Sequence, residues 1–262
     1  MNFSPIPPGF HSIDVELVAS DVGDMWFPTI DLVMRDHIRN ARTWEPDLGH
    51  VLREILPTGP SVFLDIGANV GYFTRFVAAS FPHAVVHAFE PHPLTYQVLR
   101  MNAWEFGNQI QTWPLALSDR RGTLALTTSL NNLGDTRGIR SEARLRTSMV
   151  APSISLDELL PDLRADVVKI DVQGAEFAVL QGMKAVIQRS PHIRIVMEFS
   201  PGLLHADGME PLAALGKLRE EGFDLNLFRP GAPYWASDAE IIEFCRSAGP
   251  MGQANLLLAA KL

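Results

Sequence analysis

The sequence has little of what secreted and membrane-spanning proteins need. Cys245 is the single cysteine in 262 residues, so no disulfide can form within the chain and we expect a reducing compartment. No apolar run approaches the roughly 20 residues that a membrane helix requires. Residues 1–16 also lack the cationic and apolar regions of a secretory leader. We therefore expect a cytoplasmic protein with no membrane partner.

Positive charge is also scarce. Lys and Arg together number 22 against 30 Asp and Glu, which gives a formal net charge of −8. Nucleic-acid affinity depends on clustered cations that displace counterions from phosphates, so we expect no nucleic-acid partner. One local cluster remains, and it predicts either a solvated loop or a site that attracts an anionic acceptor: Arg137, Arg140, Arg144 and Arg146.

Short apolar runs alternate with helical patterns along most of the chain. We expect strands at 61–65, 84–89, 110–115, 166–170, 193–198, 223–228 and 255–260. Helical spacing falls at 72–80, 93–106, 175–188, 210–221 and 238–245. Such alternation predicts an α/β fold with helices on both faces of a parallel sheet. The last run follows its helix too closely for a crossover, so we predict a doubly wound, mostly parallel seven-stranded sheet with a C-terminal antiparallel strand.

The chain is expected to form one structural domain with two additions. Residues 1–60 read as an N-terminal extension or cap, in which strands at 13–18 and 26–33 pair and a helix covers 47–56. Residues 61–262 form the core domain. Within it, residues 120–164 are too long for a simple crossover and predict a lid-like insertion.

A glycine turn provides the strongest local signal. In VFLDIGANVGYFT an apolar strand ends at Asp65, and Gly67 and Gly71 flank a turn that opens a helix. In a doubly wound sheet this turn faces the crevice at the carboxyl ends of the strands, where nucleotide-like ligands bind. Glycines there allow a ligand to approach the backbone. The alternative is a tight turn that needs glycine for its backbone angles alone.

An acidic residue follows the next strand. Glu90 lies about 25 positions after Asp65, near the spacing of about 20 residues expected of a ribose-binding acid beyond such a turn. A carboxylate at this point can accept hydrogen bonds from both ribose hydroxyls, or it can be a solvated strand end. A dinucleotide site would carry a middle glycine where Asn69 stands, so an NAD-dependent oxidoreductase is retained only as an alternative.

These motifs resemble a known family. The pattern D-x-G-x-x-x-G, the later Glu-Pro pair and Ala116-Leu117-Ser118-Asp119 are similar to the cofactor frame of class I methyltransferases, which are Rossmann-like. Together with VVKIDVQGAEFAVLQG and VMEFSP, they resemble the FkbM family over about residues 45–262. The family usually carries Glu where Gln173 stands.

The resemblance implies S-adenosylmethionine as cofactor and S-adenosylhomocysteine as product. Ala116 and Leu117 would lie along the adenine, the backbone near Gly67 would face the methionine part, and Glu45 would approach the amino group. Sequence physics alone makes Glu45 a helix-start residue. The full set of expected cofactor contacts is Glu45, Asp65, Gly67, Ala68, Asn69, Gly71, Glu90, Pro91, Ala116, Leu117 and Ser118.

The implied activity is O-methylation of a small molecule, a natural product or a sugar-containing acceptor. A non-catalytic cofactor-binding protein is a second alternative. The hydroxyl proton needs a base, and the candidates are Asp171, Glu198 and His205, with His205 ranked last on position. Each candidate also has a non-catalytic alternative: Asp171 holds the start of the following helix and the cofactor, Glu198 caps the following turn, and His205 is a surface residue.

Metal, oligomeric state and two further charged residues complete the predictions. Asp171 and Glu198 could hold a divalent cation, but no tight ligand cluster is present, so a metal is not favoured. The sequence does not determine the oligomeric state, and a homodimer is one of the states that it allows. We expect Lys169 to extend from the sheet to solvent, rather than to pair with an acid or substrate. We expect the negative charge of Glu176, in the first turn of its helix, to interact favourably with the helix dipole.

Overall fold

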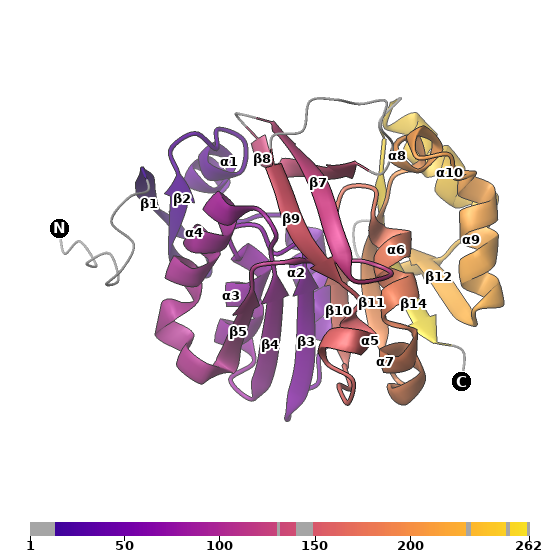
Figure 1. The fold of residues 1–262 in the computed structure, drawn as a ribbon, viewed down its shortest axis with the longest axis horizontal. Helices are drawn as coiled ribbons and strands as arrows, with labels where there is room; N and C mark the ends of the chain where they lie inside the picture. The colour runs from indigo at the N-terminus through magenta and orange to yellow at the C-terminus, as the bar shows by residue number, and fades with distance from the viewer. Residues whose placement is uncertain (1–13, 130–131, 140–148, 229–231, 250–251, 261–262) are drawn as a thin grey trace.

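The structure, a computed structural model, describes residues 14–129, 132–139, 149–228, 232–249 and 252–260. Its centre is a sheet with the order β13-β12-β14-β11-β10-β3-β4-β5 (Figure 1). The strands are β3 (Ser61–Ile66), β4 (Ala84–Phe89), β5 (Ile110–Trp113), β10 (Val167–Ile170), β11 (Arg194–Phe199), β12 (Phe223–Leu227), β13 (Tyr234–Trp235) and β14 (Ala254–Ala260).

The predicted fold class is confirmed. Strands β5, β4, β3, β10 and β11 are parallel neighbours, and β14 lies antiparallel between β11 and β12. The sheet has eight strands instead of seven, because the two-residue β13 adds an antiparallel edge beside β12.

Alternate residues of the strands bury opposite faces of the sheet. Leu64 and Ile66 of β3 belong to one core cluster, whereas Phe63 belongs to another, as the two-residue period of a strand requires. Helices cover both faces. They are α2 (Pro46–Ile55), α3 (Tyr72–Ser80) and α4 (Pro93–Ala103) against the second cluster, and α6 (Glu176–Gly182), α7 (Lys184–Arg189), α9 (Pro211–Glu220) and α10 (Asp238–Ser247) against the first.

Two predicted elements are shorter in the structure. The single helix expected at 175–188 is broken into α6 and α7 at Met183. Gly182 ends α6 in close contact with the backbone of Ser118, where an added Cβ would meet the carbonyl oxygen at 1.8 Å. The helix expected at 93–106 becomes α4 and then a 3-10 segment, η1 (Trp104–Gln109).

The N-terminal segment packs into the core. Strands β1 (Val15–Ser20) and β2 (Gly23–Pro28) form a hairpin, and α1 (Met34–Ala41) follows. The second strand begins and ends earlier than the predicted 26–33. The hairpin turn at residues 20–23, where Gly23 takes a φ of 92°, sets its start, and a turn in which the Asp31 N–H donates to the Pro28 carbonyl at 3.1 Å ends it. Asn102 of α4 joins the hairpin to the core: its side chain accepts from the Trp26 N–H at 2.7 Å and donates to the carbonyls of Trp26 and Val70 at 2.9 and 2.8 Å.

The insertion forms a second, four-stranded sheet of order β6-β9-β7-β8. Its strands are β6 (Ala116–Leu117), β7 (Gly122–Ser129), β8 (Asn132–Ile139) and β9 (Met149–Ile154). The predicted strand at 123–128 corresponds to β7. Of the arginine cluster, Arg140, Arg144 and Arg146 lie outside the described residues, as does the side chain of Arg137.

The remaining described helices are α5 (Leu156–Leu159) and α8 (Pro201–Ala206), which are short like η1. Across the described part of the chain, no helix combines the length and the apolar character needed to cross a membrane.

Candidate active site

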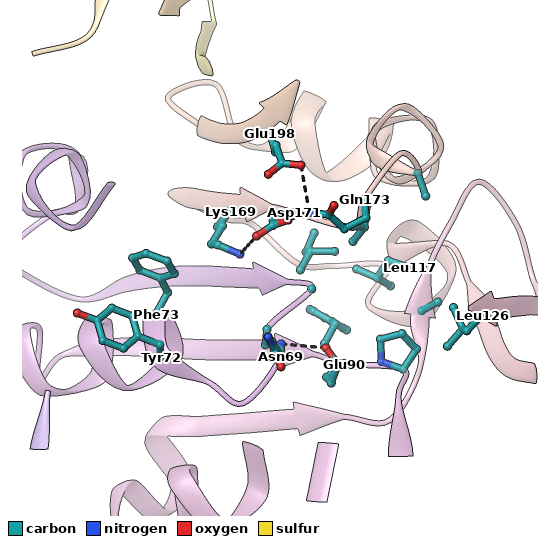
Figure 2. A pocket seen from close by; sticks show the side chains of 18 of the residues that line it. Asn69, Tyr72, Phe73, Glu90, Leu117, Leu126, Lys169, Asp171, Gln173 and Glu198 are labelled. Atoms are coloured by element: carbon teal, nitrogen blue, oxygen red, sulfur yellow. Dashed lines mark hydrogen bonds and ion pairs between the residues drawn. The ribbon is translucent and has the colours of Figure 1, made fainter. Parts of the chain in front are cut away.

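A cavity of about 360 Å³ lies where four neighbouring parallel strands end. Residues at or just beyond the ends of β4, β3, β10 and β11 form its floor, and β7 and the N-terminal segment contribute to its walls. It is lined by these predicted residues: Glu45, Gly67, Ala68, Asn69, Glu90, Pro91, Ala116, Leu117, Asp171 and Glu198. The strand ends thus bring together residues from distant parts of the sequence (Figure 2).

Four predicted residues do not line the cavity. Asp65 is fully buried beneath it, and Gly71 caps the start of α3. Ser118 is buried behind Leu117, with its N–H donating to the Ile154 carbonyl. His205 is on α8, with a side chain 74% exposed and 3.5 Å from Glu210. A direct cofactor or catalytic role for these four stays a prediction.

One end of the cavity centres on Glu90. Its Oε1 accepts hydrogen bonds from the His92 N–H and the Thr95 hydroxyl, each at 2.8 Å, and its Oε2 accepts from the Asn69 N–H at 2.9 Å. Burial raises the pKa of this carboxyl group above its ordinary value. A carboxylate has about four lone-pair positions, so protein donors occupy three and leave room for one ribose hydroxyl rather than both.

Asn69 provides a second acceptor beside Glu90. Its backbone is left-handed, with φ 51°, and its buried Oδ1 has no hydrogen-bond partner among the described residues. Buried polar atoms are rarely left unpaired, so this oxygen fits a ligand hydroxyl. Leu117 and Leu126 form apolar wall on the same side of the cavity (Figure 2).

The glycines of the turn are explained by packing. Gly67 has φ 81°, and a Cβ there would lie 1.9 Å from the carbonyl oxygen of Asp171. Gly71 has φ 90°, and its Cβ would lie 2.6 Å from Leu99 Cδ1. Both positions therefore require glycine without any ligand. The backbone-angle alternative accounts for the glycines, while Gly67 also lines the cavity.

The other end of the cavity is built around a buried ammonium group. Lys169 is only 5% exposed, and its Nζ lies 3.2 Å from Asp171 Oδ2 and 3.6 Å from Asp65 Oδ1. Thr74 donates to the other oxygen of Asp65 at 2.6 Å. The expectation that Lys169 extends to solvent is wrong: burial opposes its charge, but the carboxylates around it outweigh burial and raise its pKa. Strand alternation gave a usable signal, because Lys169 in β10 and Asp171 just beyond its end are two positions apart and so point to the same face.

Two more acids face this end. Glu198, near the end of β11, accepts hydrogen bonds from the amides of Gln173 at 3.1 Å and Gln253 at 2.6 Å. Burial and the charge of Asp171 raise the pKa of Glu198 to about 9. Glu45 begins α2 with φ 42°. Burial and Asp171 also raise its pKa, to about 7, while the side chains of Trp44 and Asn255 hydrogen-bond to it.

The loop after β10 is held from below by Glu176. Its carboxylate is buried and accepts hydrogen bonds from the backbone N–H groups of Val172 and Gly174, at 3.2 and 3.0 Å. These contacts fix the turn in which Gln173 takes φ 52°. Glu176 therefore supports the loop directly, beyond the helix-dipole role that was predicted.

Several lining residues were not predicted from the sequence. Trp44, Tyr72, Phe73 and Gln253 contribute to the walls at the Lys169 end. They come from three separate segments. Tyr72 and Phe73 directly follow Gly71 in the glycine-turn motif and Trp44 directly precedes Glu45, so their positions gave a usable signal, whereas nothing in the sequence around Gln253 marks it. Among the residues that the structure describes, no group of three or more His, Cys, Asp or Glu side chains is arranged to hold a metal ion.

Comparisons with known proteins add the following. The sequence pattern of the family described as "Methyltransferase FkbM domain" matches residues 65–225. Methyltransferase sdnD of Sordaria araneosa is 28% identical over 217 residues, 70% of this chain and 80% of that protein. Hexuronic acid methyltransferase AglP of Haloferax volcanii is 31% identical over 130 residues, 48% of this chain and 52% of that protein.

A solved structure, PH0793 of Pyrococcus horikoshii, is similar over 94% of this chain and 71% of that chain. Its TM-score is 0.50 at 11% identity. At this identity the likeness concerns the fold alone.

Proposed function

Because the chain belongs to the FkbM family of methyltransferases, as the motifs predicted, we propose that it transfers a methyl group from S-adenosylmethionine to a hydroxyl group of a small molecule. The family implies this cofactor, and the enzyme is a methyltransferase. The acceptor, the hydroxyl chemistry and the roles of the individual residues are our proposal.

The observation that carries the proposal is the excess of carboxylates at one end of the cavity. Asp65, Asp171, Glu45 and Glu198 surround the single ammonium group of Lys169. A surplus of acid in a buried site favours a cationic ligand. S-adenosylmethionine, when bound, supplies a methyl group on a positively charged sulfur, and this charge matches the acidic end.

The opposite end suits an adenosine. Glu90 Oε2 and Asn69 Oδ1 are the two oxygen acceptors for ribose hydroxyls, one with a spare lone pair and one without a protein partner. Pro91 and Leu117 offer apolar contact for the adenine. Neighbouring strands lie about 4.8 Å apart, so the three strand steps from β4 to β11 span roughly 14 Å. If the adenosine binds at the end of β4, the part of the cavity at the end of β11 remains for the acceptor.

On the acceptor side, the protein holds the reacting groups together and removes a proton. Trp44 and Phe73 form part of the cavity wall near Lys169. Asp171 and Glu198 offer carboxyl oxygens to the hydroxyl group of the acceptor. Alignment of the acceptor oxygen with the methyl carbon supplies much of the rate of a displacement reaction. The Haloferax volcanii relative, by its name, acts on a hexuronic acid. A sugar-containing molecule or a natural product is therefore the acceptor class that we propose.

Product analysis tests the proposal. The protein is incubated with S-adenosylmethionine and a panel of hydroxylated glycans and natural products, and methylated products are identified by mass spectrometry and by the chemical shift of the new methyl group. We expect an O-methyl product that is absent when the acceptor hydroxyl is already blocked. An N- or C-methyl product would contradict the hydroxyl assignment. Cofactor binding without transfer to any acceptor in the panel would support the non-catalytic alternative.

A further inference from the structure

Glu198 is held by two neutral amide groups. Gln173 Nε2 donates to Oε1 at 3.1 Å, and Gln253 Nε2 donates to Oε2 at 2.6 Å. The same Gln173 nitrogen donates to Asp171 Oδ1 at 2.9 Å, so one amide bridges both acids (Figure 2). Glu198 is only 8% exposed. Its carboxyl group is therefore fixed in place at the cavity wall. Each carboxylate oxygen has two lone pairs and accepts one of these hydrogen bonds, so one lone pair on each oxygen remains for a ligand.

The charges around Glu198 are almost all negative. Asp171 just after β10, Glu176 in α6 and Glu45 at the start of α2 act on it as like charges, and Lys169 is the cation that opposes them. The Lys169 ammonium is already paired with Asp171 and Asp65. With a pKa of about 9, Glu198 carries a proton at neutral pH in the ligand-free protein, and a protonated carboxyl group cannot act as a base.

Asp171 is less suited to take a proton from the acceptor. Its Oδ2 faces the Lys169 ammonium at 3.2 Å and its Oδ1 accepts from Gln173. Among the described residues, the hydrogen-bond partners of Glu198 are the amides of Gln173 and Gln253. Glu198 also lies one strand further from Glu90, on the side that we assign to the acceptor. Position and partners thus favour Glu198.

On the basis of the function proposed above, we infer that Glu198 takes the proton of the acceptor hydroxyl, and that the positive charge of the bound methyl donor is what ionises it. In the reaction, the hydroxyl O–H bond breaks and its proton passes to the Glu198 carboxylate. The oxygen electron pair forms the new O–CH₃ bond, and the electron pair of the broken S–CH₃ bond stays on sulfur. The sulfur loses its positive charge as Glu198 becomes neutral, so the site returns to its resting state.

Gln173 and Gln253 are positioning residues in this scheme. Hydrogen bonds donated to a carboxylate favour its charged form, so the two amides lower the cost of ionising Glu198 in a buried acidic site. Gln253 is exposed and is the easier of the two to replace. Gln253→Ala should move the acidic limb of the pH dependence of kcat to higher pH, whereas a purely structural role would lower kcat without moving the limb.

Proton release on binding tests the inference without any turnover. Calorimetric titrations at pH 8, each in two buffers with different ionisation enthalpies, give the number of protons released per ligand bound. At this pH most of Glu198 is still protonated and most of Glu45 is already ionised, given their pKa values of about 9 and 7. We expect S-adenosylmethionine to release close to one proton and S-adenosylhomocysteine, which lacks the sulfonium charge, to release far less.

Variants identify the group that releases the proton. Glu198→Gln should abolish the release while S-adenosylmethionine still binds, and it should lower kcat about 10²- to 10⁴-fold, as loss of a general base does. Glu243→Gln, on an exposed side chain of α10, should match wild type in both.

The outcomes separate the inference from the proposed function. If neither ligand binds, the proposed function fails. If both bind with equal proton release, or if Glu198→Gln still releases the proton, the inference fails and the methyltransferase assignment stands. Equal proton release by the two ligands on wild type overturns the inference even if the variant does not fold.

Discussion

Replacement of Lys169 by methionine should strongly destabilise the fold. Methionine keeps the length and apolar stem of the side chain but removes the charge that faces Asp65 and Asp171 at 3.6 and 3.2 Å. Asp65 is fully buried, so it is left as an uncompensated charge. Removing one partner of a buried ion pair costs about 3 to 5 kcal/mol, and we expect this loss in the free energy of unfolding at pH 7.

The loss should depend on pH in a defined direction. Burial already raises the pKa of Asp65 above its ordinary value, and without Lys169 this pKa rises further. A group whose pKa is raised by folding binds a proton more tightly in the folded state, so its contribution to stability is lost as the pH rises. Lys169→Met should therefore lie closer to wild type at pH 5 than at pH 8.

Urea unfolding followed by circular dichroism measures the effect. The double variant Asp65→Asn/Lys169→Met should lose less than the sum of the two single variants, with a coupling energy of about 2 to 3 kcal/mol. Lys184→Met is the matched control, because Lys184 is 51% exposed and lies 3.8 Å from Glu221; exposed pairs are worth at most about 1 kcal/mol. A loss below about 1 kcal/mol for Lys169→Met, or no coupling to Asp65, would refute the reasoning.

Three further predictions concern stability. Gly67→Ala should cost at least about 2 kcal/mol in thermal unfolding, because of its positive φ and the Asp171 carbonyl; Gly59→Ala, with open space around it, should stay within about 0.5 kcal/mol. Asn102→Leu should cost about 3 kcal/mol through lost buried hydrogen bonds and should speed amide hydrogen exchange in the hairpin of β1 and β2; unchanged exchange there would contradict the docking role. Glu198→Gln should gain stability relative to wild type between pH 5 and pH 9, because folding raises the pKa of Glu198 from 4.5 to about 9 and wild type alone loses stability over that range; parallel pH curves of melting temperature would count against it.

The predicted residues that the structure brings together at the cavity are those placed by strand ends. Gly67, Glu90, Asp171 and Glu198 each lie at or beside the end of a parallel strand, and the ends of neighbouring parallel strands meet at one edge. Apolar runs and turn residues locate these ends. The same reasoning placed all seven long strands of the sheet, with ends shifted by at most two residues.

The remaining features depend on contacts between distant segments. Gln253 reaches Glu198 only because β14 inserts between β11 and β12. Lys169 was misjudged because Asp65, one of the two acids that retain it in the interior, comes from another strand, β3. At the break between α6 and α7, Gly182 packs closely against the backbone of Ser118, a residue far away in the sequence. Local propensity carries no information on such contacts.

The occupancy of the cavity by the adenosyl cofactor is tested most directly by calorimetric titration of S-adenosylhomocysteine into wild type and Glu90→Ala, with the fold of the variant checked by circular dichroism. We expect one site per chain and binding weaker by about 1 to 3 kcal/mol in the variant, the effect of losing a hydrogen bond to a charged group. The absence of binding to wild type, or equal affinity in a folded variant, would contradict the assignment of this cavity to the methyl donor.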